Sequence, residues 1–272
     1  MKGPRLPYRY DHYTWVEIRE VARRQPQPVV ILPIGSVEDN GHHLPLDVDN
    51  FCIWSITEAA AERAPEEILL MPLVPYGFET HHMEFCGTID VKPRHLEDFV
   101  VDVTTSVARH GFRRILIADG HGSNMPILEL AARRTVLETD GRTLCAAFIW
   151  PSLIPEAISE IRQSGRGGMA HACELETSLY LHLNAPAVQM DKAVSEYSEH
   201  PSNFHWQDLQ HGAKIKFMDW WSRISRTGTV GDAKLATAEK GKVVFEAAVD
   251  KLIELVREFR EWQDLPRRDH HG

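Results

Sequence analysis

Short apolar runs alternate with amphipathic segments along most of this chain. Four runs rich in Val, Ile and Leu have the length of buried strands, at residues 29–34, 68–74, 114–118 and 143–150. Further segments carry apolar residues at helical spacing, at residues 13–24, 51–63, 94–110, 124–139, 169–183 and 235–262. This alternation predicts βαβ units and a mostly parallel sheet with helices on both faces. The expected fold class is therefore α/β, a three-layer α/β/α sandwich in a single domain spanning residues 1–272.

The segments between these elements carry weaker signals. Asn50 is expected to cap the helix that follows it. Residues 151–168 have an irregular pattern, and residues 188–194 resemble an edge strand. Residues 197–222 are polar yet hold several Phe and Trp, so they predict an insertion that forms either a lid over a pocket or a subunit interface. Residues 263–272 are expected to form a mobile tail.

The densest cluster of polar side chains follows the first apolar run directly. After residue 34 the sequence changes to carboxylates, amides and imidazoles, at Glu38, Asp39, Asn40, His42, His43, Asp47 and Asp49. Open α/β folds place their sites at the carboxyl edge of the sheet, and carboxylates with imidazoles are typical metal ligands. The cluster therefore predicts metal-binding or acid/base chemistry. The alternative is an acidic loop exposed to solvent.

Three later segments offer more side chains of the same kind. His82 follows the second strand, where a substrate contact or a structural role is more expected than metal binding. His121 lies between two glycines in the loop DGHGSN and is expected to be a metal ligand. His171 and Glu174 are spaced to share one face of an expected helix, whereas Glu176 projects roughly opposite. As an alternative, the two carboxylates of this segment are exposed charges or helix caps.

The mixture of carboxylates and imidazoles also limits the choice of cofactor. Such ligands suit a divalent Zn, Mn or Fe(II) ion. They leave room for a water molecule whose pKa the metal lowers.

Composition and charge exclude several classes of partner. The chain has 30 Lys and Arg against 39 Asp and Glu, a net charge of −9, so neither nucleic acid nor an anionic membrane is expected as a partner. No apolar run has the length of a membrane span or the pattern of a signal peptide. The four cysteines are widely spaced without a CxxC motif, which favours reduced thiols and a cytoplasmic location.

Two other functions compete with metal-dependent catalysis. The loop DGHGSN lies between a strand and a helix, where a glycine-rich loop can bind phosphate, but it lacks the third glycine and the acidic ribose ligand of a dinucleotide site. The other candidate is a non-catalytic oligomeric scaffold. A scaffold does not require converging buried carboxylates and imidazoles.

Several stretches, taken in order, resemble the signature of the creatininase family. GSVEDNGHHLPLDVD is similar to the family's GSxEQHGPHLPxxxD, DGHGSN to NGHGGN, and HACELETS to HAxExETS. FCGT and TGTVGDAKLATAEKG resemble two further stretches of the family. The resemblance implies an α/β/α sandwich, metal-dependent hydrolysis of cyclic amides, formamides or related bonds, one or two metal ions per subunit, and a homo-oligomer, commonly a hexamer.

The resemblance also implies metal ligands. Glu38 matches the first metal-binding Glu of the family, Asp49 the Asp that bridges two metal ions, and His121 the histidine of the glycine loop. The fourth ligand varies within the family. Creatininase itself has a carboxylate where this chain has Ser123, and members that lack it carry a Glu that matches Glu174.

Catalytic and substrate-binding positions follow from the same resemblance. His171 matches a catalytic histidine near the substrate, and Glu174 is expected to act in catalysis as well as in metal binding. Substrate contacts are expected at His82, Trp150, Ser123 and Asn40.

One position departs from the family signature. The histidine that binds the second metal ion in the family is Asn40 in this chain. An amide oxygen binds transition metals far more weakly than imidazole does. Either the second site is weak or empty, or His42 replaces the missing ligand.

The expected activity is hydrolysis of a small polar substrate. A metal-activated water would cleave the C–N bond of a cyclic amide or formamide, and His171 would deliver a proton to the leaving nitrogen. The alternative is hydrolysis of a C–C bond in a cyclic diketone such as an oxidised inositol, which the family resemblance also allows.

Overall fold

A parallel sheet of four strands forms the centre of the computed structural model, which describes residues 5–198, 202–263 and 265–271. The strands run in the order β2-β1-β3-β4, with β1 at Val29–Ile34, β2 at Ile68–Leu70, β3 at Arg114–Asp119 and β4 at Leu144–Ile149. Val30 of β1 aligns with Leu69 on one side and with Ile115 on the other. Strand β1 is paired along both edges and covered on both faces, so all six of its residues are buried.

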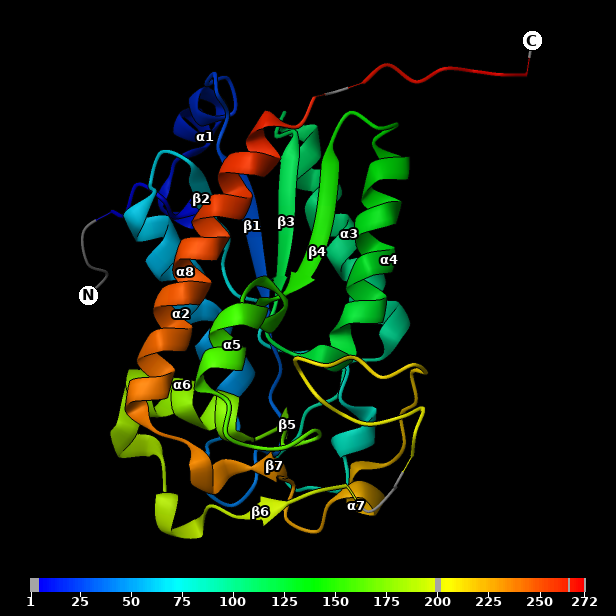
Figure 1. Cartoon of the computed structure of the whole chain (residues 1–272). Helices are drawn as coiled ribbons and strands as arrows, with labels where there is room; N and C mark the ends of the chain where they lie inside the picture. The colour runs from blue at the N-terminus through cyan, green and yellow to red at the C-terminus, as the bar shows by residue number, and fades with distance from the viewer. Residues whose placement is uncertain (1–4, 199–201, 264, 272) are drawn as a thin grey trace.

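Helices cover both faces of this sheet (Figure 1). One layer contains α2 (Val48–Arg63) and α8 (Ala238–Glu261), and the other contains α3 (Pro93–Arg109) and α4 (Met125–Glu138). Val29 and Ile31 pack with the first layer, whereas Leu32 and Ile34 pack with the second, as expected for side chains that alternate along a strand. The expected α/β/α sandwich is confirmed.

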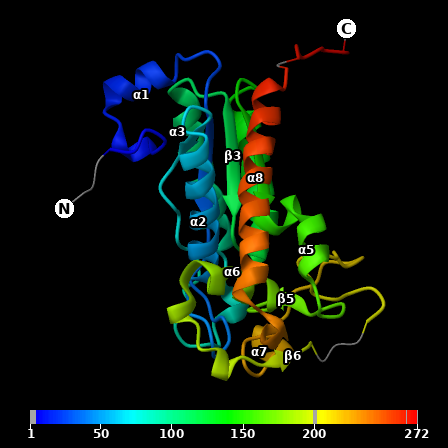
Figure 2. The same cartoon turned by 60° about the vertical axis from the view of Figure 1, so that its left-hand side comes forward.

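A smaller antiparallel sheet lies beyond the carboxyl ends of the main strands, in the lower part of Figure 1. Its strands run in the order β5-β7-β6, with β5 at Met169–His171, β7 at Val230–Asp232 and β6 at Ser195–Glu196. The remaining α-helices are α1 (Trp15–Val21), α5 (Pro155–Ile161), α6 (Glu174–Asn184) and α7 (Trp221–Ile224). Helix α8 packs along both α2 and α6, which Figure 2 shows from the side. None of the described helices is long and apolar enough to cross a membrane.

Two elements begin or end differently from the sequence-based expectation. Helix α2 starts at Val48, with Asp47 in the N-cap position, so Asn50 lies inside the first turn. The side-chain amide of Asn50 instead donates to the backbone carbonyls of Ser36 and Pro75. Strand β2 ends at Leu70, two residues before a proline that has no N–H to donate to a ladder.

The largest error concerns residues 169–183, which were expected to be one helix. They divide into β5 and α6, separated by a sharp reversal at Ala172, whose φ of 47° lies in the left-handed region. His171 is therefore a strand residue and does not share a helix face with Glu174. Residues 151–168 contain α5, and residues 188–194 form a 3₁₀ turn at Met190–Lys192 instead of an edge strand.

Two further expectations reach beyond the described residues. Residues 199–201 of the aromatic segment 197–222 lie outside the described part of the chain. The same holds for residues 264 and 272 of the tail 263–272. Residues 265–271 form no helix or strand and are exposed. The mobility expected for this tail stays a prediction.

Candidate metal centre

The candidate metal centre lies at the carboxyl edge of the main sheet. Glu38 belongs to the loop after β1, and Asp49 to the first turn of α2. His121 directly follows β3, at the glycine loop. A side chain at Gly120 would place its Cβ 2.5 Å from the carbonyl oxygen of Asp49, so this glycine allows the start of α2 to approach the loop. Residues far apart in the sequence thereby meet at one edge.

Glu38, Asp49 and His121 form the first group of metal-ligating atoms. Nδ1 of His121 lies 3.1 Å from Oε1 of Glu38 and 2.9 Å from Oδ2 of Asp49. Atoms bound to one metal ion at about 2.1 Å lie roughly 2.9–3.5 Å from each other in octahedral or tetrahedral geometry. The spacing of these three atoms therefore fits a shared divalent cation.

The carboxylate of Glu38 is the strongest sign that a cation belongs here. Glu38 is 1% exposed, and neither of its oxygens has a hydrogen-bond partner among the described residues. Burial, followed by the charge of Glu79, raises the pKa of Glu38 to about 8 although two histidines lower it. A buried carboxylate without donors costs free energy unless a cation binds it. The donor set therefore fits the metal that the sequence predicts.

A second group of possible ligands shares Glu38 and adds His82 and His171. Nε2 of His82 lies 3.5 Å from Oε2 of Glu38, and Nδ1 of His171 lies 3.5 Å from Oε1. The other nitrogen of each ring contacts Asp39. His82 Nδ1 lies 2.7 Å from the Asp39 carboxylate, and His171 Nε2 lies 2.7 Å from its backbone carbonyl.

The carboxylates and imidazoles of this second group shift each other's pKa values. Burial raises the pKa of Asp39, but hydrogen bonds to His171 and His82 outweigh it and bring the pKa to about 2. Burial lowers the pKa of His171, but the charges of Glu38 and Asp39 outweigh that effect and raise it to about 10. Without a metal ion, the site therefore holds protons where a cation would otherwise sit.

A third group contains Glu79, His81 and His121. Nε2 of His121 lies 2.9 Å from Oε1 of Glu79, which is fully buried. His81 points its Nε2 at the hydroxyl of Ser123, 2.9 Å away. Burial lowers the pKa of His81 to about 2, and the three neighbouring histidines contribute in the same direction. His81 is therefore a neutral side chain.

Apolar and aromatic side chains surround these groups and form a cavity of about 1000 Å³. Trp221 stacks on the ring of His82, with centroids 4.5 Å apart, and meets His171 edge-on at 5.1 Å. Trp150 lines the same cavity, as expected for a pocket residue, and Ser123 does so as well. The segment from His205 to Met218 supplies part of the wall, so the aromatic insertion lines the cavity of its own chain.

Glu174 is not brought together with the other expected ligands. Its carboxylate contacts Lys240 Nζ at 2.5 Å and accepts hydrogen bonds from the backbone N–H groups of Gln163 and Ser164. These partners satisfy the carboxylate, and Glu174 does not line the cavity. The structure thus corrects the expectation that Glu174 is a metal ligand and a catalytic residue. Its role is to connect α6 with α8 and the end of α5.

Glu176 occupies the place that was expected for Glu174. It lines the cavity with Glu38, Asp49 and His171. Burial raises the pKa of Glu176 to about 7, and the charges of Asp49 and Glu38 contribute, although His171 lowers it. The sequence analysis expected Glu176 to point away from His171, because it assumed one continuous helix over residues 169–183. The reversal at Ala172 breaks that helix and changes the direction of the side chain.

Asn40 and His42 also differ from expectation. Asn40 is buried and donates to the backbone carbonyl of Glu38 at 3.2 Å, but it does not line the cavity, which gives no support for a substrate contact. His42 is exposed and belongs to none of the three groups, so it does not replace the missing family histidine.

Sequence reasoning gave no role to Asp39, Glu79 and His81. The signal for Glu79 and His81 was the polar loop after β2, where the doublet at residues 81 and 82 was conspicuous. Asp39 stood in the first polar cluster without a defined role. Trp221 belongs to the segment 197–222, expected to form a lid or an interface, but its contact with His82 spans 139 positions of the chain and depends on the tertiary fold.

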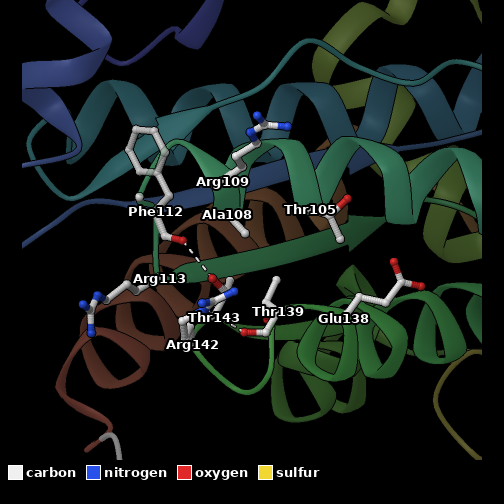
Figure 3. Close-up of a pocket in the computed structure, with 10 residues that line it drawn as sticks. Thr105, Ala108, Arg109, Phe112, Arg113, Glu138, Thr139, Arg142 and Thr143 are labelled. Atoms are coloured by element: carbon white, nitrogen blue, oxygen red, sulfur yellow. Dashed lines mark hydrogen bonds between the residues drawn. The ribbon is translucent and has the colours of Figure 1, made fainter.

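A separate pocket of about 470 Å³ lies at the opposite edge of the sheet, before β3 and β4 (Figure 3). Arg109, Arg113 and Arg142 line it together with Thr139 and Thr143. The hydroxyl of Thr143 donates to the backbone carbonyl of Phe112 at 3.1 Å. This pocket holds none of the three groups of possible metal ligands, so the chemistry predicted from the sequence belongs to the larger cavity.

Comparisons with known proteins agree with this geometry. The family model described as "Creatininase: Creatinine amidohydrolase" matches residues 11–256. Mycofactocin precursor peptide peptidase of Mycobacterium tuberculosis (strain CDC 1551 / Oshkosh) is 30% identical over 247 residues, which cover 88% of this chain and 87% of that protein. Creatinine amidohydrolase of Pseudomonas putida is 29% identical over 244 residues, covering 85% and 89%. A solved mutant creatininase of the Zn–Zn type has a TM-score of 0.79 and 25% identity, covering 92% and 97%.

Proposed function

The chain belongs to the creatininase family of hydrolases, and on that premise we propose that it is a metal-dependent enzyme that cleaves an amide C–N bond. The observation that carries the proposal is the group formed by Glu38, Asp49 and His121. The carboxylate oxygens lie 2.9–3.1 Å from the imidazole nitrogen, at the wall of a large cavity, and no described residue donates a hydrogen bond to Glu38.

Glu38 Oε1, Asp49 Oδ2 and His121 Nδ1 would hold a Zn, Mn or Fe(II) ion. When bound, the ion would act as a Lewis acid toward the substrate carbonyl and lower the pKa of water. Ser36 donates to the same Asp49 oxygen at 2.7 Å and so orients that carboxylate. Gly120 allows the close approach that keeps Asp49 beside His121.

Glu176, in place of Glu174, is the group that we assign to proton transfer. It would take a proton from the attacking water and deliver it to the leaving nitrogen, and a pKa of about 7 suits both steps near neutral pH. His171 is less suited to this role. Its Nε2 is bonded to the Asp39 carbonyl, and its Nδ1 faces Glu38.

The cavity supports a substrate larger than a single small ring. A volume of about 1000 Å³ is at the upper end of the range of roughly 300–1,000 Å³ for ligand sites. Trp150, Trp221 and Phe217 give its wall apolar surface, which favours a substrate with an apolar portion. A peptide amide fits this description better than creatinine does, and a relative that covers most of the chain is named as a peptide peptidase.

A substrate panel tests this proposal. The protein, stripped of metal and reloaded with Zn, Mn or Fe(II), is incubated with short peptides that contain aromatic residues, with creatinine, with formamides and with a cyclic diketone. Mass spectrometry of the products is expected to show metal-dependent cleavage of the peptides, absent in Asp49→Ala. Cleavage of the diketone alone would contradict the C–N assignment. Cleavage that persists without metal would contradict the metal-dependent mechanism.

The homo-oligomer implied by the family resemblance, commonly a hexamer, stays a prediction for this chain. Size-exclusion chromatography with light scattering is the direct test.

A further inference from the structure

We propose that this chain has a second metal position built from Glu38, His82 and His171, which replaces the family position that Asn40 has lost. The inference rests on the proposed function, because Glu38 is shared with the first position. The family signature implies a different arrangement. There, a histidine at the position of Asn40 binds the second metal ion.

The spacing of the ligand atoms carries the proposal. His82 Nε2 and His171 Nδ1 each lie 3.5 Å from an oxygen of Glu38, and the ring centroids of the two histidines lie 4.8 Å apart. Ligands about 2.1 Å from a tetrahedral ion lie roughly 3.4 Å from each other. His82 faces Oε2 of Glu38, whereas His171 and His121 both face Oε1, so Oε2 is the oxygen that only the second group approaches and Oε1 lies between the two groups.

Asp39 orients both histidines for this role. Its carboxylate contacts Nδ1 of His82, and its backbone carbonyl contacts Nε2 of His171, each at 2.7 Å. A ligating histidine typically donates its other N–H to a carboxylate or a carbonyl, which fixes the tautomer and the ring orientation. Here one residue supplies both partners, and both of the remaining nitrogens face Glu38.

Trp221 completes the surroundings of these two histidines. Its ring stacks on His82 and meets the edge of His171, and its Nε1 donates to the backbone carbonyl of Gly228 at 3.0 Å. Both histidines are therefore held by apolar contact on one side and by Asp39 on the other. Neither ring is free to turn away from Glu38 without breaking these contacts.

The local structure at Asn40 explains why a different residue supplies the ligand. Its amide donates to the backbone carbonyl of Glu38, and its side chain does not line the cavity. His82 comes from the loop after β2 and approaches Glu38 from another direction. With both nitrogens of His171 engaged, Glu176 remains the proton-transfer group of the cavity.

The test compares His82→Ala with His43→Ala, another buried histidine, which bonds to Thr177 and belongs to none of the three groups of possible metal ligands. Metal-stripped protein is titrated with Co(II) and followed by visible absorption, and zinc content is measured by elemental analysis after loading. We expect about two equivalents per chain for the wild type and for His43→Ala, and about one for His82→Ala. The absorption bands of the second Co(II) equivalent should be absent only in His82→Ala.

Asp39→Asn provides an independent measurement if His82→Ala fails to fold by circular dichroism. This variant should lower the affinity for the second Co(II) equivalent by roughly 10–100-fold and leave the affinity for the first unchanged. Two equivalents in His82→Ala, or only one in the wild type, would overturn the second position and leave the first intact. A wild type that binds no metal would overturn the proposed function as well, so the two failures are distinguishable.

Discussion

Nε2 of His121 lies 2.9 Å from Oε1 of Glu79, while Nδ1 of the same ring faces Glu38 and Asp49. Glu79 is fully buried and comes from the loop after β2, on the side of the imidazole opposite to the proposed ligands. The two atoms lack hydrogen-bond geometry, so Glu79 acts on this nitrogen through its charge. A negative charge beside one nitrogen favours a proton there and leaves the other nitrogen available to a metal ion.

The first prediction concerns this orienting carboxylate. Glu79→Gln should lower the affinity of the first metal position by roughly 10–100-fold, because the neutral amide no longer places a negative charge beside Nε2 of His121. Competition with a chelator of known affinity measures the change. Glu84→Gln, an exposed residue of the same loop, is the control and should bind metal as the wild type does. Equal affinities of the two variants would remove Glu79 from the site.

The second prediction separates the two glutamates of α6. Glu176→Gln should fold normally and lower turnover by roughly 10²–10⁴-fold, the usual contribution of a general acid/base. Glu174→Gln should keep most of the turnover and the metal content but reduce stability, because its carboxylate contacts Lys240 and two backbone N–H groups. Steady-state kinetics with metal analysis distinguishes them. The reverse pattern would restore Glu174 to the catalytic site.

A third prediction concerns the ion pair between α6 and α8. Lys240 contacts Glu174, whose side chain is fully buried, so Lys240→Met leaves a buried carboxylate without its cation. The free energy of unfolding should fall by about 3 kcal/mol, as is typical for a broken buried pair. Urea denaturation measures the loss, with Lys251→Met as a control because Lys251 forms an exposed ion pair on the same helix. A loss below about 1 kcal/mol, the value of an exposed pair, would contradict the prediction.

The fourth prediction concerns His43 and pH. Burial lowers the pKa of His43 to about 4, with smaller contributions from His171 and His42, so the folded state keeps this imidazole neutral. The unfolded chain takes up the proton near pH 6.5. The contribution of neutral His43 to the free energy of unfolding is therefore fully present above pH 6.5. It is lost as the pH falls toward 4, by an amount on the order of 3 kcal/mol.

Unfolding experiments across this pH range test the effect of His43. In metal-free protein, His43→Gln, which cannot titrate but can still bond to Thr177, should lose less stability between pH 7 and pH 4 than the wild type. Replacing the exposed His95 with Gln should leave the pH dependence as it is in the wild type. If the wild type and His43→Gln have parallel curves, His43 does not titrate in this way.

The sequence predicted the main sheet well because β1, β2 and β3 are buried along their whole length. Strand β1 has the expected bounds, because the apolar run from Val29 to Ile34 is stable only in the core. The reversal at Ala172 was not predictable, because neither glycine nor proline marks it. It depends on the pairing of β5 with β7, about sixty residues later in the chain.

The site was predictable to the extent that its residues follow strands. Glu38, Asp49 and His121 lie directly after β1 and β3 or at the start of α2, and the structure brings them together. His82 was assigned to substrate binding because the sequence does not show where a single loop histidine points its side chain. Its orientation depends on Asp39 and Trp221, whose positions come from tertiary packing.

The wide separation of these residues along the chain has a consequence for how the protein acquires its metal in the cell. During synthesis, Glu38 and Asp49 leave the ribosome long before His121, and His171 follows later still. Metal uptake at either position must therefore wait until the loops after β1 and β3, or β5, are made and folded together. Which ion is acquired then depends on the divalent cations available to the finished protein, since the affinity of such ligands follows the general order of the transition metals.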